Sequence, residues 1–177
     1  MAGHNKWAQI KHQKGVTDKK RGLIFSKILK AIAIAAREEP TPTPNTLGEG
    51  AGPRLRSLIE RAKKLGVPNE TIERAIQKTK DGVALEELTL EAYGPGGIAI
   101  LIHSITDNHN RTVSEVKHLL SENEGKLAEQ GSVRWAFDGD SPKFPQETTP
   151  QEKERVLKLV GALEDHDDVQ KVITNLK

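Results

Sequence analysis

The stretch LTLEAYGPGGIAILIHS at residues 88–104 decides how the second half of the chain folds. In its first part Leu88, Leu90 and Ala92 alternate with other residues, and a period of two is typical of a half-buried strand. Its second part, Ile98–Ser104, is mostly aliphatic and follows the turn-forming run Gly94–Gly97. We therefore predict a β-hairpin whose second strand is central in a sheet.

Downstream of this hairpin the pattern predicts a helix, a strand, a second helix and a last strand. The first helix spans residues 112–123, with Thr112 and Glu115 at capping-box spacing, and the second begins at Thr149 with Glu152 in the same relation. Strands are predicted from alternation over 133–137 and 169–174. The order β-β-α-β-α-β predicts an α+β fold, a ferredoxin-like sandwich with helices on one face of a mostly antiparallel sheet.

Upstream of the hairpin the apolar residues recur at helical spacing in three segments. These segments are 23–36, 53–65 and 68–78, the second opening on Pro53 and stopping at Gly66. Each offers one narrow apolar face, so the three are expected to share a small core as a helical bundle. Residues 1–22 have few apolar side chains and are predicted to form a loosely docked arm, and Pro, Thr and Gly in 38–52 predict a flexible connection.

Charge divides the chain at the same place. Residues 1–80 hold 17 basic and 7 acidic side chains, whereas residues 81–177 hold 10 basic and 18 acidic ones. Halves of opposite sign favour two domains, 1–80 and 81–177, of which the first faces a polyanion. The chain has no cysteine, which excludes thiol chemistry, and its longest apolar run is too short to cross a bilayer. We expect a cytoplasmic protein without a membrane partner.

The basic half supplies the candidate nucleic-acid contacts. Lysine and arginine neutralise phosphates, and an aromatic ring among them offers a surface on which a base can stack. The residues predicted to bind nucleic acid are Lys6, Trp7, Lys11, Lys14, Lys19, Lys20, Arg21, Arg54, Arg56 and Lys64. The alternative interpretation is a solvated charged surface that binds nothing.

The polar run 107–111 joins the predicted central strand to a helix. It gathers a carboxylate, an imidazole and a guanidinium, but Asp and Asn at such a junction commonly bond the backbone in turns and caps. We predict that Asn108, Asn110 and Arg111 contact a partner, with the alternative that the asparagines shape the turn and Arg111 pairs with an acid of its own domain. The acidic run 164–168 is interpreted as a connecting loop, and Gly94–Gly97 as a hairpin turn rather than a dinucleotide site.

Seven blocks of sequence, in this order, cover nearly the whole chain and resemble the YebC family of probable transcriptional regulators and the related mitochondrial translation activators. The blocks are MAGHNKWAQIKHQK (1–14), KKRGLIFSK (19–27), PRLRSLIERAK (53–63), YGPGG (93–97), TDNHNRT (106–112), GSVRWAF (131–137) and ALEDHDDVQKV (162–172). The resemblance implies a three-helix domain, a second α+β domain, no enzymatic activity, a bacterial cytoplasmic setting and a role in gene expression. Members of the family carry a third domain after the block that matches GSVRWAF, where this chain has only residues 138–150, so the chain resembles a compact variant.

The sequence therefore predicts a nonenzymatic nucleic-acid-binding regulator, a probable transcriptional regulatory protein that binds DNA. No catalytic motif occurs, and no cofactor or metal is expected. One alternative is a translation factor that binds ribosomal or transfer RNA, or the ribosome. The other is a protein-interaction module that docks through its acidic half.

Overall fold

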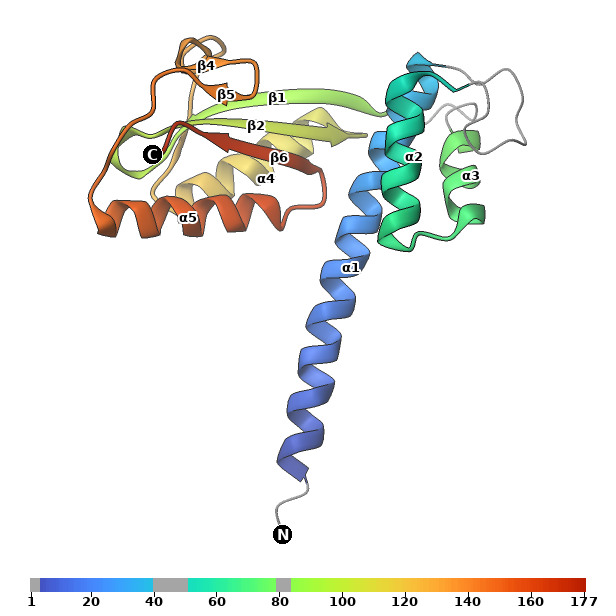
Figure 1. Ribbon diagram of the computed structural model, residues 1–177. Helices are drawn as coiled ribbons and strands as arrows, with labels where there is room; N and C mark the ends of the chain where they lie inside the picture. Colours follow the sequence, from blue (N-terminus) through green and yellow to red (C-terminus); the bar gives the residue numbers. More distant parts are fainter. Residues whose placement is uncertain (1–3, 40–50, 79–83) are drawn as a thin grey trace. The chain divides into compact units, whose positions relative to one another are not determined.

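The computed structural model describes residues 4–39, 51–78 and 84–177, and the side chains of residues 18–39, 51–77 and 84–177. The chain forms two compact units, Met1–Gly82 and Val83–Lys177. The first is helical and the second combines helices with an antiparallel sheet (Figure 1), so the α+β prediction is confirmed. No helix in the described parts of the chain is both long and apolar enough to cross a membrane.

The helical unit consists of α1 (His4–Glu38), α2 (Pro53–Leu65) and α3 (Asn69–Lys78). Its core is aliphatic and includes Ile28, Ile32, Leu55, Ile59 and Ile72. As predicted, α2 has proline at its first turn and ends at Gly66, whose φ of 84° lies in the left-handed region that glycine adopts without strain.

The predicted arm over residues 1–22 is wrong for its described part, because α1 begins at His4 instead of Leu23. No proline interrupts residues 4–38, and this stretch is rich in the good helix formers Ala and Lys. Apolar periodicity reveals only the packed part of a helix, which here begins near Phe25. The sequence pattern therefore predicted where α1 is buried rather than where it starts.

The second unit contains a four-stranded sheet in the order β3-β1-β2-β6, in which every neighbouring pair is antiparallel. The bounds of these strands are Lys126–Leu127 (β3), Glu86–Tyr93 (β1), Ala99–Thr106 (β2) and Val169–Thr174 (β6). The predicted hairpin is β1 and β2, joined by the 3-10 turn η1 (Pro95–Gly97), and β2 is central as predicted.

Two helices, α4 (His109–Glu122) and α5 (Pro150–Glu164), cover one face of this sheet (Figure 1). Their buried side chains pack on those of β2 in a core that includes Ile100, Ile102, Val116, Leu120 and Leu159. Thr149 and Glu152 form the predicted capping box of α5. The predicted box of Thr112 and Glu115 is wrong, because α4 begins three residues earlier and Asn108 is its N-cap.

The opposite face of the sheet is covered by the segment after β3, and here the predicted strand over 133–137 is wrong. The segment forms the 3-10 turn η2 (Arg134–Ala136), followed by the short pair β4 (Phe137–Asp138) and β5 (Ser141–Pro142). The buried carboxylate of Glu91 accepts hydrogen bonds from the backbone N–H groups of Gly131, Val133 and Arg134, at 2.7, 2.8 and 3.2 Å. These donors are therefore not available to a strand ladder.

Candidate nucleic-acid interface

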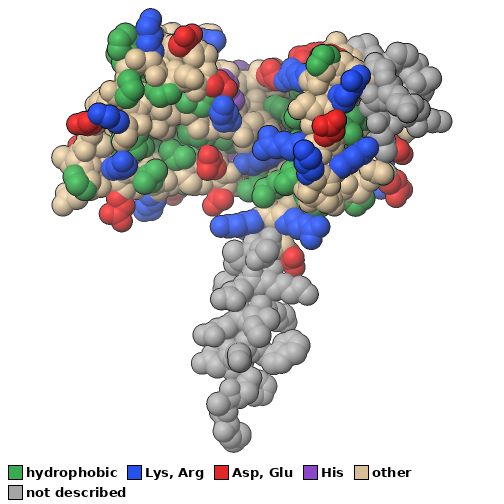
Figure 2. Space-filling view, in the orientation of Figure 1, with side chains coloured by type: hydrophobic (Ala, Val, Ile, Leu, Met, Phe, Trp, Pro, Cys, Tyr) green, Lys and Arg blue, Asp and Glu red, His purple; other side chains and the backbone are tan. Residues whose placement is uncertain are grey.

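Five exposed cations lie where the C-terminal end of α2 meets α1. We call this group the basic end; it consists of Lys19, Lys20 and Arg21 on α1 and Lys63 and Lys64 on α2. The two helices run antiparallel, because the backbone N–H of Leu55 bonds the Glu39 carboxylate at 3.1 Å at one end of α2, while Arg21 lies beside Gly66 at the other. Figure 2 shows Lys and Arg side chains gathered at the lower end of this helical unit.

Contacts within the helical unit hold Arg21 in place. Its guanidinium carbon lies 5.2 Å from the centre of the Phe25 ring, a cation–π distance, and Phe25 itself packs against the core. A Cβ on Gly66 would lie 3.3 Å from the guanidinium, so Arg21 is in close contact with the end of α2. The backbone carbonyls at this end carry a partial negative charge that stabilises the three neighbouring cations on α2 and α1.

The basic end has the electrostatic character that a phosphate backbone requires. Its cations are exposed, and Asp18 is an exposed acid that directly precedes them on α1. Positive side chains crowded on a small surface attract polyanions and are relieved of mutual repulsion when phosphates bind between them.

The structure separates the predicted cations into two places. Lys64 joins Lys19, Lys20 and Arg21 at the basic end, whereas Arg54 and Arg56 lie at the start of α2. A 13-residue helix is about 20 Å long, so the two groups are roughly that far apart. Arg54 forms an ion pair with Glu38, and Arg56 donates to the carbonyl of Ala51 at 3.2 Å. Their role in nucleic-acid binding stays a prediction.

The remaining predicted contacts, Lys6, Trp7, Lys11 and Lys14, belong to the first three turns of α1. Their side chains lie outside the part of the chain whose side chains the structure describes. Lys63 is the member of the basic end that the predicted set omitted. Its signal in the sequence is its position beside Lys64 in the last turn before a helix-ending glycine, where cations are favoured.

The loop between β2 and α4 places its predicted contact residues in internal bonds. Asn108 Oδ1 accepts from the backbone N–H of Arg111 at 3.1 Å, which caps α4. Arg111 bonds the buried Asp168 at 2.8 Å and Asp107 at 2.9 Å. These bonds, first that to Asp168 and then that to Asp107, raise the pKa of Arg111 above its ordinary value. Asn110 is exposed. This is the geometry that the structural alternative requires.

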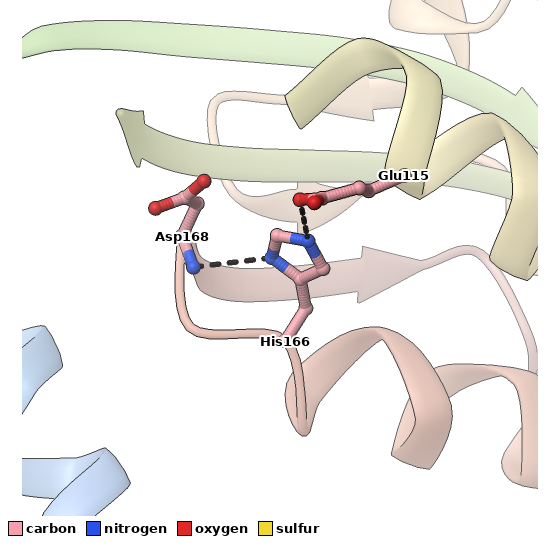
Figure 3. A group of neighbouring side chains, drawn as sticks. All are labelled: Glu115, His166 and Asp168. Atoms are coloured by element: carbon pink, nitrogen blue, oxygen red, sulfur yellow. Dashed lines mark hydrogen bonds and ion pairs between the residues drawn. The ribbon is translucent and has the colours of Figure 1, made fainter. Parts of the chain in front are cut away.

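Three side chains of the second unit lie close enough to suggest a cation site (Figure 3). Glu115, His166 and Asp168 each bring a ligand atom to within 4.8 Å of the others. However, His166 Nδ1 accepts the backbone N–H of Asp168 at 3.1 Å, so Nε2 carries the ring proton, 2.9 Å from Glu115. A metal needs that nitrogen deprotonated, and Arg111 already supplies positive charge to Asp168. The cluster is therefore suited to joining α4 to the segment before β6.

The fold defines a two-unit α+β protein with a basic helical unit and an acidic sheet unit. Residues 5–82 match the model of the TACO1/YebC protein N-terminal domain, and residues 85–141 match that of the TACO1/YebC second and third domain. The chain belongs to the TACO1/YebC family.

Relatives with the same architecture are longer than this chain. A probable transcriptional regulatory protein of Fervidobacterium nodosum is 36% identical over 241 residues, covering 99% of this chain and 93% of that protein. One of Solibacter usitatus is 45% identical over 168 residues, covering 93% of this chain and 63% of that protein. Since the first alignment runs over 241 residues and this chain has 177, the chain lacks a segment that the relative has.

A solved structure agrees with the fold. The crystal structure of a conserved hypothetical protein from Aquifex aeolicus is similar with a TM-score of 0.79 and 29% identity, covering 89% of this chain and 90% of that one.

Proposed function

We propose that this chain is a nonenzymatic regulator of gene expression that binds DNA through phosphate contacts made by the basic end. The observation that carries the proposal is the group of five exposed cations that α1 and α2 bring to one surface. The names of the relatives, which are probable transcriptional regulatory proteins, favour DNA over RNA as the target.

Phosphate contacts attach a protein to nucleic acid without selecting a sequence. Lysines and an arginine at the end of a helix pair suit this kind of contact, because each is exposed and none has to enter a groove. Replacing Lys19, Lys20 and Arg21 together by alanine should therefore weaken binding of all DNA sequences alike. We expect a loss of affinity of at least tenfold at low salt, with the fold retained.

A matched control removes the same charge from the other unit. Lys117, Lys126 and Lys158 are exposed lysines of the sheet unit, and replacing all three by alanine lowers the net charge equally. Affinity for a duplex DNA of random sequence is measured by fluorescence anisotropy for the unmodified chain and both triple variants. Equal losses in the two variants would show that only overall charge matters and would contradict a local interface.

The same titration with a structured RNA of equal length separates the DNA proposal from the RNA alternative. Tighter binding of the RNA at equal salt, with the loss again confined to the variant of Lys19, Lys20 and Arg21, would contradict DNA as the target and leave the interface in place. Absence of binding to either nucleic acid would overturn the proposed function.

A further inference from the structure

Two aromatic side chains of the sheet unit lie together on its surface. Trp135 is 61% exposed and Phe144 is 51% exposed, and their ring centres are 5.8 Å apart with an angle of 42° between the planes. We call them the aromatic pair. Large aromatic rings usually bury their faces, so two neighbouring exposed rings indicate a surface that meets a ligand.

The aromatic pair is held by hydrogen bonds on both sides. Trp135 Nε1 donates to the carbonyl of Ser132 at 2.7 Å, and the backbone around Ser132 is fixed by the bonds of Gly131 and Val133 to Glu91. Phe144 is held through its backbone, whose carbonyl accepts from Asn175 Nδ2 at 3.1 Å. Rings presented in this way lose little conformational entropy when a flat ligand stacks on them.

Cations accompany both rings. Lys143 Nζ lies 5.5 Å from the centre of the Phe144 ring, and Arg134 precedes Trp135 and is exposed. The exposed acid Asp140 nearby in the chain is paired with Lys171 at 2.8 Å. The surface therefore offers stacking faces together with positive charge, although the sheet unit as a whole is acidic.

The size of the apolar surface argues against a protein partner. A stable protein interface covers about 800 Å² on each side and has an apolar centre. The exposed residues between the two rings in sequence are polar or small, namely Asp138, Gly139, Asp140, Ser141 and Lys143, together with Pro142. Two rings with cations beside them instead fit the pattern by which proteins bind unpaired nucleotides, where each base stacks on an aromatic face.

We propose that the aromatic pair stacks unpaired bases of a single-stranded nucleic acid, with Arg134 and Lys143 contacting its phosphates. This inference rests on the proposed function, since it assumes that the chain binds nucleic acid, and adds a second site that reads strandedness. The family model for the second and third domain matches only as far as residue 141, between the two rings. The site therefore lies where this chain departs from the family's domain pattern.

Fluorescence gives a direct test, because the chain has two tryptophans, Trp7 and Trp135. In a Trp7→Phe background the remaining emission comes from Trp135. The probes are a 12-nucleotide single strand, as DNA and as RNA, and the matching duplexes. Stacking predicts that single strands quench Trp135 with the same midpoint as binding measured by anisotropy, and that duplexes bind without quenching.

Substitutions in the same background test whether the rings contribute to affinity. Trp135→Ala should weaken single-strand binding about tenfold, a loss that persists at high salt because stacking is not electrostatic, and leave duplex binding unchanged. Trp135→Phe should restore most of the affinity, and Phe144→Ala should resemble Trp135→Ala. Melting curves should be nearly unchanged, since both rings are mostly exposed.

The outcomes separate this site from the basic end. Equal affinity of Trp135→Ala for single strands, or an equal loss for single strands and duplexes, overturns the stacking site. If the variant of Lys19, Lys20 and Arg21 still loses affinity in that case, the proposed function survives. Absence of any binding by the unmodified chain overturns both proposals. A preference of the quenching for RNA or for DNA identifies which single strand the site takes.

Discussion

Asp168 shows how a single buried acid organises the sheet unit. It is 2% exposed, and its Oδ2 bonds Arg111 at 2.8 Å and the Thr112 hydroxyl at 2.7 Å. A buried carboxylate is tolerated only when it is paired and hydrogen-bonded, and here both partners come from α4. The two blocks TDNHNRT and ALEDHDDVQKV, far apart in sequence, are thus joined through this carboxylate.

Thr112→Val tests the weight of this bond. Valine has the shape of threonine but no hydroxyl, so Asp168 loses a donor at a fully buried position, and we expect the free energy of unfolding to fall by about 1–2 kcal/mol. Arg111→Ala should also lower the melting temperature. Both variants should bind DNA with the affinity of the unmodified chain. Reduced affinity of Arg111→Ala with an unchanged melting curve would instead support the partner contact predicted from sequence.

Helix ends explain most of the local structure, and glycine has opposite roles at two of them. Gly22 lies inside α1, and a Cβ there would meet no atom within 4 Å. Gly66 ends α2 with a φ of 84°, where a Cβ would be strained and would press on Arg21. The same substitution should therefore have opposite effects at the two positions.

Gly22→Ala should stabilise the chain by about 0.5–1 kcal/mol, because alanine restricts the unfolded chain and favours the helix. Gly66→Ala should destabilise it by about 1 kcal/mol or more. Chemical denaturation of the two variants, monitored by helical circular dichroism, measures both values. Stabilisation by Gly66→Ala would contradict the left-handed end of α2.

The capping box of α5 predicts a pH dependence. Hydrogen bonds from the hydroxyls of Thr148 and Thr149, and from the backbone of Thr149, hold the pKa of Glu152 below its ordinary value of 4.5. A carboxyl whose folded-state pKa is depressed contributes stability above its ordinary pKa and loses it as the pH falls through the folded value. The contribution is therefore present at neutral pH and is lost in acid below about pH 4.5.

Glu152→Gln should accordingly lower the melting temperature at pH 7 and change it much less at pH 3, where the carboxyl of the unmodified chain is protonated. Thr149→Ala should cost about 1 kcal/mol at neutral pH, the usual value of an N-cap. Melting curves at the two pH values decide the matter, and an equal effect of Glu152→Gln at both would contradict the proposed ionised cap.

At the scale of the whole molecule, the sequence predicted features that depend on local patterns. The hairpin over 88–104 was correctly predicted because alternation and turn residues are local, and the same holds for the capping box at Thr149. The strand β3 has only two residues, which leaves no period to detect. The strand predicted over 133–137 failed because Glu91, some 40 residues earlier, takes its backbone donors.

The candidate site was predictable in charge but not in geometry. An excess of cations in residues 1–80 is visible in the sequence, whereas the separation of Lys64 from Arg54 and Arg56 follows from how α2 lies along α1. Likewise the sequence could not show that Arg111 pairs with Asp168, 57 residues away.

The salt dependence of DNA binding tests the proposed interface most directly. The logarithm of the association constant should fall linearly with the logarithm of salt concentration, with a slope of about −0.9 for each phosphate contact and four to seven contacts in all. Replacing Lys19, Lys20 and Arg21 by alanine should make the slope shallower by about two to three units, while the control variant of Lys117, Lys126 and Lys158 keeps the original slope. An unchanged slope in the first variant, or a slope near zero in the unmodified chain, would contradict phosphate binding by the basic end.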